Sequence, residues 1–118
     1  MNKYRSVKQY DTTDCATACI ASLTWYYGKR ISLLELQQYM EMRSEGASVS
    51  DIIVTCEKIG LKTEAAKRTS TFNANELQCP CIAHVFLEDG EGHYIVIYKV
   101  RKNDVVISDP ALGLITIC

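Results

Sequence analysis

Apolar positions recur at helical spacing in the first half of the chain. The repeating set between Asp14 and Tyr27 consists of Ala16, Cys19, Ile20, Leu23 and Tyr27. Spacings of three and four residues place such a set on one face of a helix. Thr12, Thr13 or Asp14 can cap its start, and Gly28 stands where a helix commonly ends. The pattern therefore predicts a first helix from Asp14 to Tyr27.

Two capping patterns predict further helices. Ser32-Leu33-Leu34-Glu35 has the spacing of a capping box and predicts a helix that runs to about Met42. Ser48-Val49-Ser50-Asp51 repeats this spacing after Gly46 and predicts a third helix that stops at Gly60. The apolar stripe of the third helix consists of Ile52, Ile53, Cys56 and Ile59.

Beyond Gly60 the period changes from helix to strand. Runs of β-type residues predict four strands, over Leu61 to Ala66, Cys81 to Leu87, Tyr94 to Val100 and Val105 to Ile107. The spacer Asp89-Gly90-Glu91-Gly92 is typical of a hairpin loop, so the second and third of these strands should pair antiparallel. The fold class is therefore α+β, with N-terminal helices packed on an antiparallel β-sheet.

Composition narrows the class of protein. With 118 residues, 47% of them hydrophobic, the chain can build one compact core, so we expect one domain over residues 1–118. A net charge of −1 gives no electrostatic reason to bind nucleic acid. No apolar run approaches the roughly 20 residues that span a bilayer, and the N-terminus lacks a secretory signal. We expect a soluble, cytosol-side chain whose six cysteines are catalytic, metal-bound or free.

Cys15 is the candidate nucleophile because it lies in the first turn of the first predicted helix. Unpaired N–H groups and the positive end of the helix dipole favour a thiolate there. The base must be one of two histidines, His84 or His93. His84 shares a strand face with Ile82 and Phe86, which is the setting of a packed histidine. His93 follows the hairpin loop and starts a strand, so we expect it to be the base.

Asp109 is the expected orienting carboxylate. It follows the run Val105 to Ser108, and it returns to the level of His93 if that run pairs with the strand that carries the histidine. Gln9, six residues before Cys15, can fold back over the helix start. Its amide and the Cys15 N–H would then donate to an oxyanion.

Together these residues resemble the C39 peptidase family. The matching pattern consists of Gln9, Asp14-Cys15, Ala18-Cys19, Gly92-His93-Tyr94 with Val96, and Asp109-Pro110. The resemblance covers nearly the whole chain and implies a papain-like cysteine peptidase. It implies Cys15 as nucleophile and His93 as general base. It also implies Asp109 as the orienting acid and Gln9 as the oxyanion donor.

The resemblance also implies a function. Members are usually the N-terminal domains of ABC transporters, on the cytoplasmic side of the bacterial cell membrane, that export bacteriocins, lanthipeptides and signalling peptides. They remove the leader of a precursor peptide after a Gly-Gly or Gly-Ala pair. The peptidase domain needs no cofactor, whereas ATP is used by a separate nucleotide-binding domain. The alternative is an inert peptidase-like domain that only docks the substrate.

In such a peptidase the leader would dock as an amphipathic helix on exposed apolar anchors. The candidate anchors are Leu36, Tyr39, Met40, Val49 and Ile53. Two features depart from the family pattern. Ala16 stands where a glycine commonly follows the nucleophile, and the chain ends at Cys118, so we expect a domain truncated at its C-terminus.

The remaining cysteines have simpler interpretations. Cys19 and Cys56 lie on apolar helix faces and are expected to be buried thiols. Cys79-Pro80-Cys81 and His84 offer three ligands within six residues. Structural zinc usually takes cysteines that are further apart and a fourth ligand, so we expect no metal site.

Overall fold

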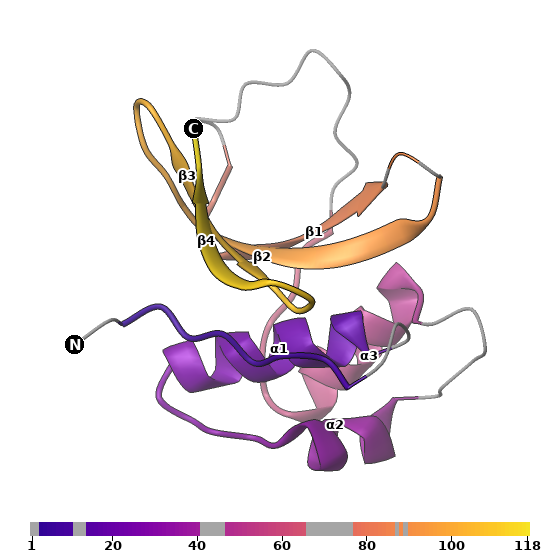
Figure 1. Cartoon of the computed structure of the whole chain (residues 1–118). Helices are drawn as coiled ribbons and strands as arrows, with labels where there is room; N and C mark the ends of the chain where they lie inside the picture. The colour runs from indigo at the N-terminus through magenta and orange to yellow at the C-terminus, as the bar shows by residue number, and fades with distance from the viewer. Residues whose placement is uncertain (1–2, 11–13, 41–46, 66–76, 87, 89) are drawn as a thin grey trace.

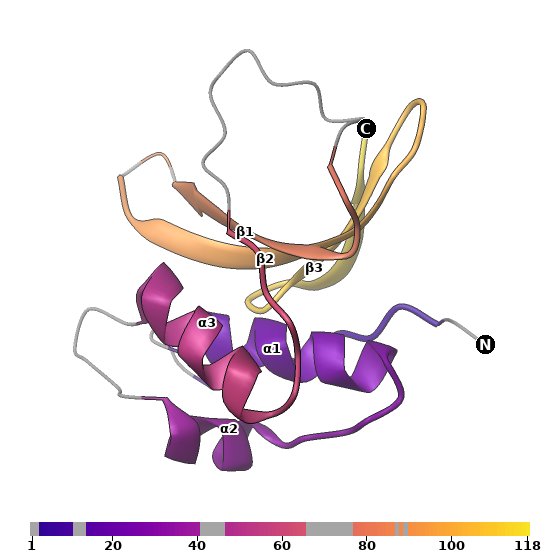
Figure 2. The same ribbon diagram turned by 180° about the vertical axis from the view of Figure 1, so that it is seen from behind.

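The computed structural model describes residues 3–10, 14–40, 47–65, 77–86, 88 and 90–118 (Figure 1). Its helices are α1 (Cys15–Tyr26), α2 (Leu33–Tyr39) and α3 (Val49–Lys58). Its strands are β1 (Cys81–Phe86), β2 (Gly92–Val100), β3 (Val105–Asp109) and β4 (Gly113–Ile117). The helices lie together against one face of the sheet in both views (Figures 1 and 2), which confirms the predicted α+β fold.

Helix α1 is the central element of the fold. Every residue from Cys15 to Thr24 is buried, so the helix is covered all round rather than along the single stripe that its pattern predicted. It packs against α2 and α3 on one side and against β2 and β3 on the other. Its buried hydroxyls bond within the helix: Ser22 Oγ donates to Ala18 O at 3.0 Å, and Thr24 Oγ1 donates to Ala21 O at 2.9 Å.

The two serine caps are present. Ser32 Oγ accepts a hydrogen bond from the Glu35 N–H at 3.1 Å at the start of α2. Ser48 and Asp51 form the complete capping box of α3, in which each side chain accepts from the other residue's N–H. Both helices therefore begin where the sequence predicts.

The C-terminal ends of the helices agree less closely with the predictions. Helix α2 stops at Tyr39 because the backbone of Met40 turns extended, with φ −101° and ψ 130°. The predicted end at Met42 lies outside the described residues. Gly28 and Gly60 follow α1 and α3 with φ of +93° and +90°, which are left-handed conformations that glycine adopts without strain.

The sheet is a meander in the order β1-β2-β3-β4, and all neighbours are antiparallel. Val85 lies opposite His93 in the β1–β2 hairpin, which confirms the pairing predicted from the glycine-rich spacer. Leu87 and Asp89, which belonged to that prediction, lie outside the described residues. Strand β3 continues past the predicted end at Ile107, so Asp109 is its last residue.

One strand prediction was wrong, and one strand was missed. Residues 61–65 form no strand, and Ala66 lies outside the described residues. Leu61 packs against the core, whereas residues 62–65 are exposed and pair with no strand. Strand β4 was not predicted, although its Ile115 lies opposite Ile107 of β3.

The N-terminal segment ties the two layers together. It runs beside α1 (Figure 1), where the Val7 N–H donates to Ser22 Oγ at 2.8 Å. Further along, the Gln9 N–H donates to the Pro110 carbonyl at 3.0 Å, just beyond β3. Gln9 is thereby fixed beside the end of the strand that carries Asp109.

Candidate active site

Cys15 is the first residue of α1 and is almost fully buried. Asp14, one of the three candidate caps, stands at the N-cap position, but its side chain makes no capping hydrogen bond. Thr12 and Thr13, the other predicted caps, lie outside the described residues. Asp14 Oδ1 instead accepts from Gln37 Nε2 at 3.0 Å. The first-turn N–H groups beside the thiol are therefore left without the Asp14 carboxylate as an acceptor.

His93 and Asp109 form a hydrogen-bonded pair. The register of β2 and β3 brings them to the same end of the sheet, with His93 Nε2 2.8 Å from Asp109 Oδ1. Both side chains are mostly buried, with exposed fractions of 13% and 16%. The Ala111 N–H also donates to Asp109 Oδ1, at 2.9 Å. With Nε2 engaged by the carboxylate, Nδ1 is the ring nitrogen left to exchange a proton with a thiol.

Cys19 and Tyr94 lie within electrostatic reach of Cys15, and Cys19 also lies within reach of Asp109. Burial raises the pKa of the Cys19 thiol, and the charges of Cys15 and Asp109 raise it further. Burial also raises the pKa of Tyr94, the residue after His93, and Cys15 adds to that effect. Cys15 Sγ makes no hydrogen bond to His93, as is common in sites without substrate, where such contacts are long.

Gln9 lies at the same end of the sheet. Its backbone bond to Pro110 holds it one residue beyond Asp109, and its Oε1 is buried with no hydrogen-bond partner among the described residues. A buried amide oxygen without a partner costs free energy. Its role as oxyanion donor stays a prediction.

The predicted docking residues divide into two groups. Leu36 and Met40 are 0% and 5% exposed and belong to the core, so they cannot serve as accessible anchors, and that part of the prediction is wrong. They face α1, which is covered on all sides. Tyr39 and Val49 are 46% and 44% exposed, and Ile53 is half-buried.

His84, the other candidate base, contacts the rings of Tyr94 and Phe86. Its ring stacks on Tyr94 at 4.3 Å and contacts Phe86 at 4.8 Å, which confirms the face it shares with Phe86. It is exposed rather than packed in the interior, because β1 is an edge strand. A Cβ at Gly92 would lie 2.6 Å from His84 Nε2, so glycine at this position leaves room for the ring.

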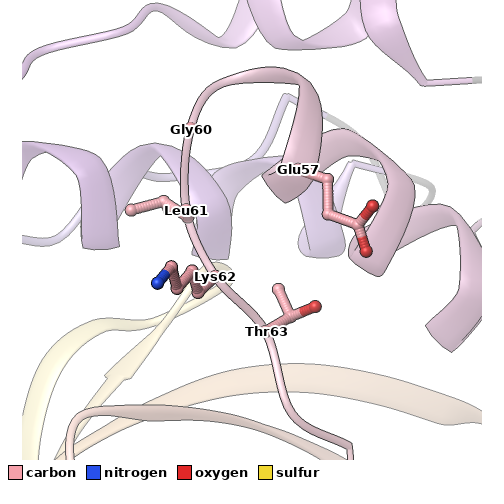
Figure 3. A pocket seen from close by; sticks show the side chains of 5 residues that line it. All are labelled: Glu57, Gly60, Leu61, Lys62 and Thr63. Carbon is pink, nitrogen blue, oxygen red and sulfur yellow. The ribbon is translucent and has the colours of Figure 1, made fainter.

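The absence of a metal site at Cys79, Cys81 and His84 stays a prediction. In the part of the chain that the structure describes, no three His, Cys, Asp or Glu side chains are grouped as metal ligands. Cys19 and Cys56 are buried thiols, as predicted. A cavity of about 500 Å³ lies at the end of α3, lined by Glu57, Gly60, Leu61, Lys62 and Thr63 (Figure 3). None of the predicted catalytic residues lines it.

The sequence did not single out Gln37. The feature that distinguishes Gln37 is its place on α2: it is a polar residue that follows the fully buried Leu36 and is itself half-buried. Its partner Asp14 was one of three candidate helix caps. Nothing in the sequence indicated that this carboxylate would accept a hydrogen bond from another helix.

Comparison with known proteins gives a consistent picture. The sequence model described as the Peptidase C39 family matches residues 3–118. The lactococcin-G-processing and transport ATP-binding protein LagD of Lactococcus lactis subsp. lactis is 36% identical over 110 residues, which are 92% of this chain. The sublancin-168-processing and transport ATP-binding protein SunT of Bacillus subtilis (strain 168) is 37% identical over 119 residues and 97% of this chain.

Solved structures share the fold. The peptidase domain of Streptococcus ComA, a bi-functional ABC transporter involved in a quorum sensing pathway, superposes with a TM-score of 0.85 at 31% identity. That match covers 97% of this chain and 85% of the ComA domain. A double glycine motif protease from an AMS/PCAT transporter, in complex with its leader peptide, has a TM-score of 0.81 at 20% identity. It covers 95% of this chain and 77% of that one, and at this identity it supports the fold alone.

The chain spans only a small part of its full-length relatives. The aligned residues make up 16% of LagD and 16% of SunT. In the described ranges no helix is long and apolar enough to cross a membrane.

Proposed function

The chain belongs to the peptidase C39 family and is a cysteine peptidase domain, and we propose that it removes the leader from a precursor peptide. The cut would follow a Gly-Gly or Gly-Ala pair, and the cargo would be a bacteriocin, lanthipeptide or signalling peptide. The observation that carries the proposal is the hydrogen bond of His93 to Asp109, in a chain whose helix α1 begins with the buried Cys15. The names of LagD and SunT, which join processing to transport, support the same reaction.

The first half of the reaction forms a thioester. His93 Nδ1 takes the proton of the Cys15 thiol, and the thiolate attacks the carbonyl carbon of the second small leader residue. The carbonyl oxygen becomes an oxyanion, which the Cys15 N–H and the Gln9 amide would stabilise. The C–N bond then breaks, and protonated His93 gives its proton to the departing cargo amine.

The second half releases the leader. His93 takes a proton from water, the hydroxide attacks the thioester carbonyl, and the C–S bond breaks to return the thiol. Asp109 holds the imidazole in one tautomer and stabilises its protonated form throughout. Every proton and electron pair moves among Cys15, His93, water and substrate, so the proposed cut needs no cofactor. ATP would serve the nucleotide-binding domain of the transporter.

The same relatives support a proposal for the setting of the domain. We propose that it works as part of an ABC transporter on the cytoplasmic side of a bacterial membrane. Tyr39, Val49 and Ile53 remain the proposed anchors for the leader helix, because their side chains are at least partly exposed on α2 and α3. An amphipathic helix needs such anchors at a distance from the scissile bond.

The test is incubation with a precursor peptide that has a double-glycine leader, followed by mass spectrometry of the products. The wild type should give one cut after the glycine pair, and Cys15→Ala should give none. Cys79→Ala is the matched control, because it removes an exposed cysteine away from the site and should cut normally. Wild-type protein that binds the leader without cutting it would support the inert docking module instead.

A further inference from the structure

The carboxylate next to the nucleophile is held by another helix. Asp14 is only 4% exposed, and its Oδ1 accepts from Gln37 Nε2 at 3.0 Å. The bond joins the residue before α1 to the middle of α2, 23 positions along the chain. A buried carboxylate needs such a donor, so this contact fixes the direction of the Asp14 side chain.

The other helices of this chain show what the contact prevents. Ser32 and Ser48 cap α2 and α3 from extended backbone, with ψ of 158° and 169°, and both side chains accept an N–H of the first turn. Asp14 occupies the same position before α1 with φ −94° and ψ 5°, and it caps nothing. Aspartate is among the best capping residues, so its failure to cap here needs a cause. Two features account for it: the Asp14 ψ of 5° lies outside the extended region that a capping residue adopts, and the bond to Gln37 holds the carboxylate toward α2.

The direction of this carboxylate matters for Cys15. A carboxylate turned toward the first turn would accept the N–H groups that otherwise stabilise a thiolate or an oxyanion. It would also place a negative charge beside the sulfur, and both effects favour the neutral thiol. Turned toward α2, Asp14 leaves those donors to the reaction.

We propose that Gln37 is a positioning residue for Cys15: its amide holds the Asp14 carboxylate against α2 and keeps the first turn of α1 open. The inference rests on the proposed function, in which Cys15 is the nucleophile. Gln37 does not touch substrate in this account and acts only through Asp14.

Other titratable groups face the same region and stay constant in the test. Cys19 lies one turn along α1, Tyr94 comes from β2, and Asp109 comes from β3. Asp51 of α3 contributes through its effect on Tyr94. Because none of these groups is changed, a difference between variants at position 37 is assigned to the Asp14 contact.

The experiment compares Gln37→Leu with Gln38→Leu, a neighbouring exposed glutamine of the same helix. The rate of Cys15 alkylation by iodoacetamide is followed from about pH 5 to pH 9 by mass spectrometry of the tryptic peptide 9–29, with fragmentation to separate Cys15 from Cys19. In Gln37→Leu the apparent pKa of alkylation should rise by roughly half to one unit, as expected for a carboxylate released near a thiol. The kcat for leader cleavage at neutral pH should fall about 3- to 10-fold with KM unchanged.

A second change separates positioning from general damage. Adding Asp14→Ala to Gln37→Leu removes both the charge and the side-chain acceptor, so the alkylation profile should return to that of Gln38→Leu. Gln37→Glu keeps the shape of the side chain and repels Asp14, and it should shift the profile in the same direction as Gln37→Leu. It serves as the test variant if the leucine protein does not fold.

The outcomes separate this inference from the proposed function. Equal alkylation profiles for the Gln37 variants and Gln38→Leu would overturn the positioning role, as would failure of Asp14→Ala to restore the profile. A wild type that never cuts the leader, but whose Cys15 alkylation depends on Gln37, would leave the positioning role intact and remove the proposed reaction.

Discussion

At the residue scale, the most constrained polar atom of the site is Asp109 Oδ1. It accepts from both His93 Nε2 and the Ala111 N–H, at 2.8 and 2.9 Å. The backbone donor holds the carboxylate in place, and the carboxylate in turn fixes the ring. The imidazole therefore presents the same nitrogen to Cys15 throughout the cycle.

Replacing Asp109 tests this arrangement. We expect Asp109→Ala to lower kcat by roughly 10²- to 10⁴-fold, since the imidazole loses both its tautomer preference and its partner when protonated. Leader cleavage under single-turnover conditions measures the effect. Asp104→Ala is the matched control, because that carboxylate lies in the turn before β3 and pairs with Arg101 instead. Activity of Asp109→Ala equal to that of Asp104→Ala would contradict an orienting role.

Some residue contacts could be anticipated from sequence and others could not. His93 and Asp109 were predicted to meet because antiparallel strands joined by a short turn return to the same level, and the structure confirms it. The Asp14 to Gln37 bond depends on how α1 and α2 pack. Two helices related only by tertiary packing leave no periodic signal that reports such a contact.

At the scale of elements, helix starts were the most predictable features because capping is local chemistry. The box at Ser48 and Asp51 satisfies two N–H groups reciprocally, and the residues involved are three apart in sequence. We expect Ser48→Ala to lower the free energy of unfolding by about 1 kcal/mol. Urea denaturation measures it. Ser50→Ala, an exposed position within α3, should be neutral or slightly stabilising because alanine favours helices.

Helix α2 provides the test of leader docking. Tyr39 is exposed at its end, and we expect Tyr39→Ala to weaken binding of a leader peptide several-fold, since a docked aromatic ring buries a large apolar area. The KM should rise while kcat stays the same. Leu34→Ala removes another exposed apolar side chain of the helix, which was not a predicted anchor. Equal KM values for the two variants would show that Tyr39 does not contribute to leader docking.

Element predictions failed where burial depends on distant partners. The spacing of Leu36 and Met40 fits both a set of exposed anchors and a buried core stripe. The packing of α2 against α1 decides between the two, and it places both residues in the core. Residues 61–65 pair with none of the four described strands, and a strand is stable only when paired. Strand β4 has that partner in β3.

At the scale of the whole molecule, the site joins both layers of the fold. The nucleophile comes from α1, whereas the base and its carboxylate come from β2 and β3. The register within the sheet could be predicted, but the distance between Cys15 and His93 depends on how the helix layer docks. Packing of the helix layer also buries two ionisable thiols, Cys19 of α1 and Cys56 of α3, so the stability of the fold depends on pH.

Buried thiols make the fold sensitive to high pH. Burial raises the pKa of Cys56 from 9.0 to about 11. Between these two values the folded state keeps the proton and the unfolded chain loses it, so the unfolded state binds fewer protons and stability falls as pH rises. The stabilising contribution is intact below about pH 9 and is lost by about pH 11. The loss from Cys56 alone is roughly 2–3 kcal/mol.

Urea unfolding under reducing conditions from pH 8 to about pH 11 measures this slope. Cys56→Ala should be less stable than wild type at pH 8, because it leaves a small cavity, yet its stability should fall less steeply, by up to about 1.4 kcal/mol per pH unit. Some slope should remain, since burial also raises the pKa of Cys19 and Tyr94. Cys79→Ala should keep the wild-type slope, because that side chain is exposed in the folded protein as well. Parallel slopes for Cys56→Ala and wild type would show that the Cys56 thiol does not contribute to the alkaline loss of stability.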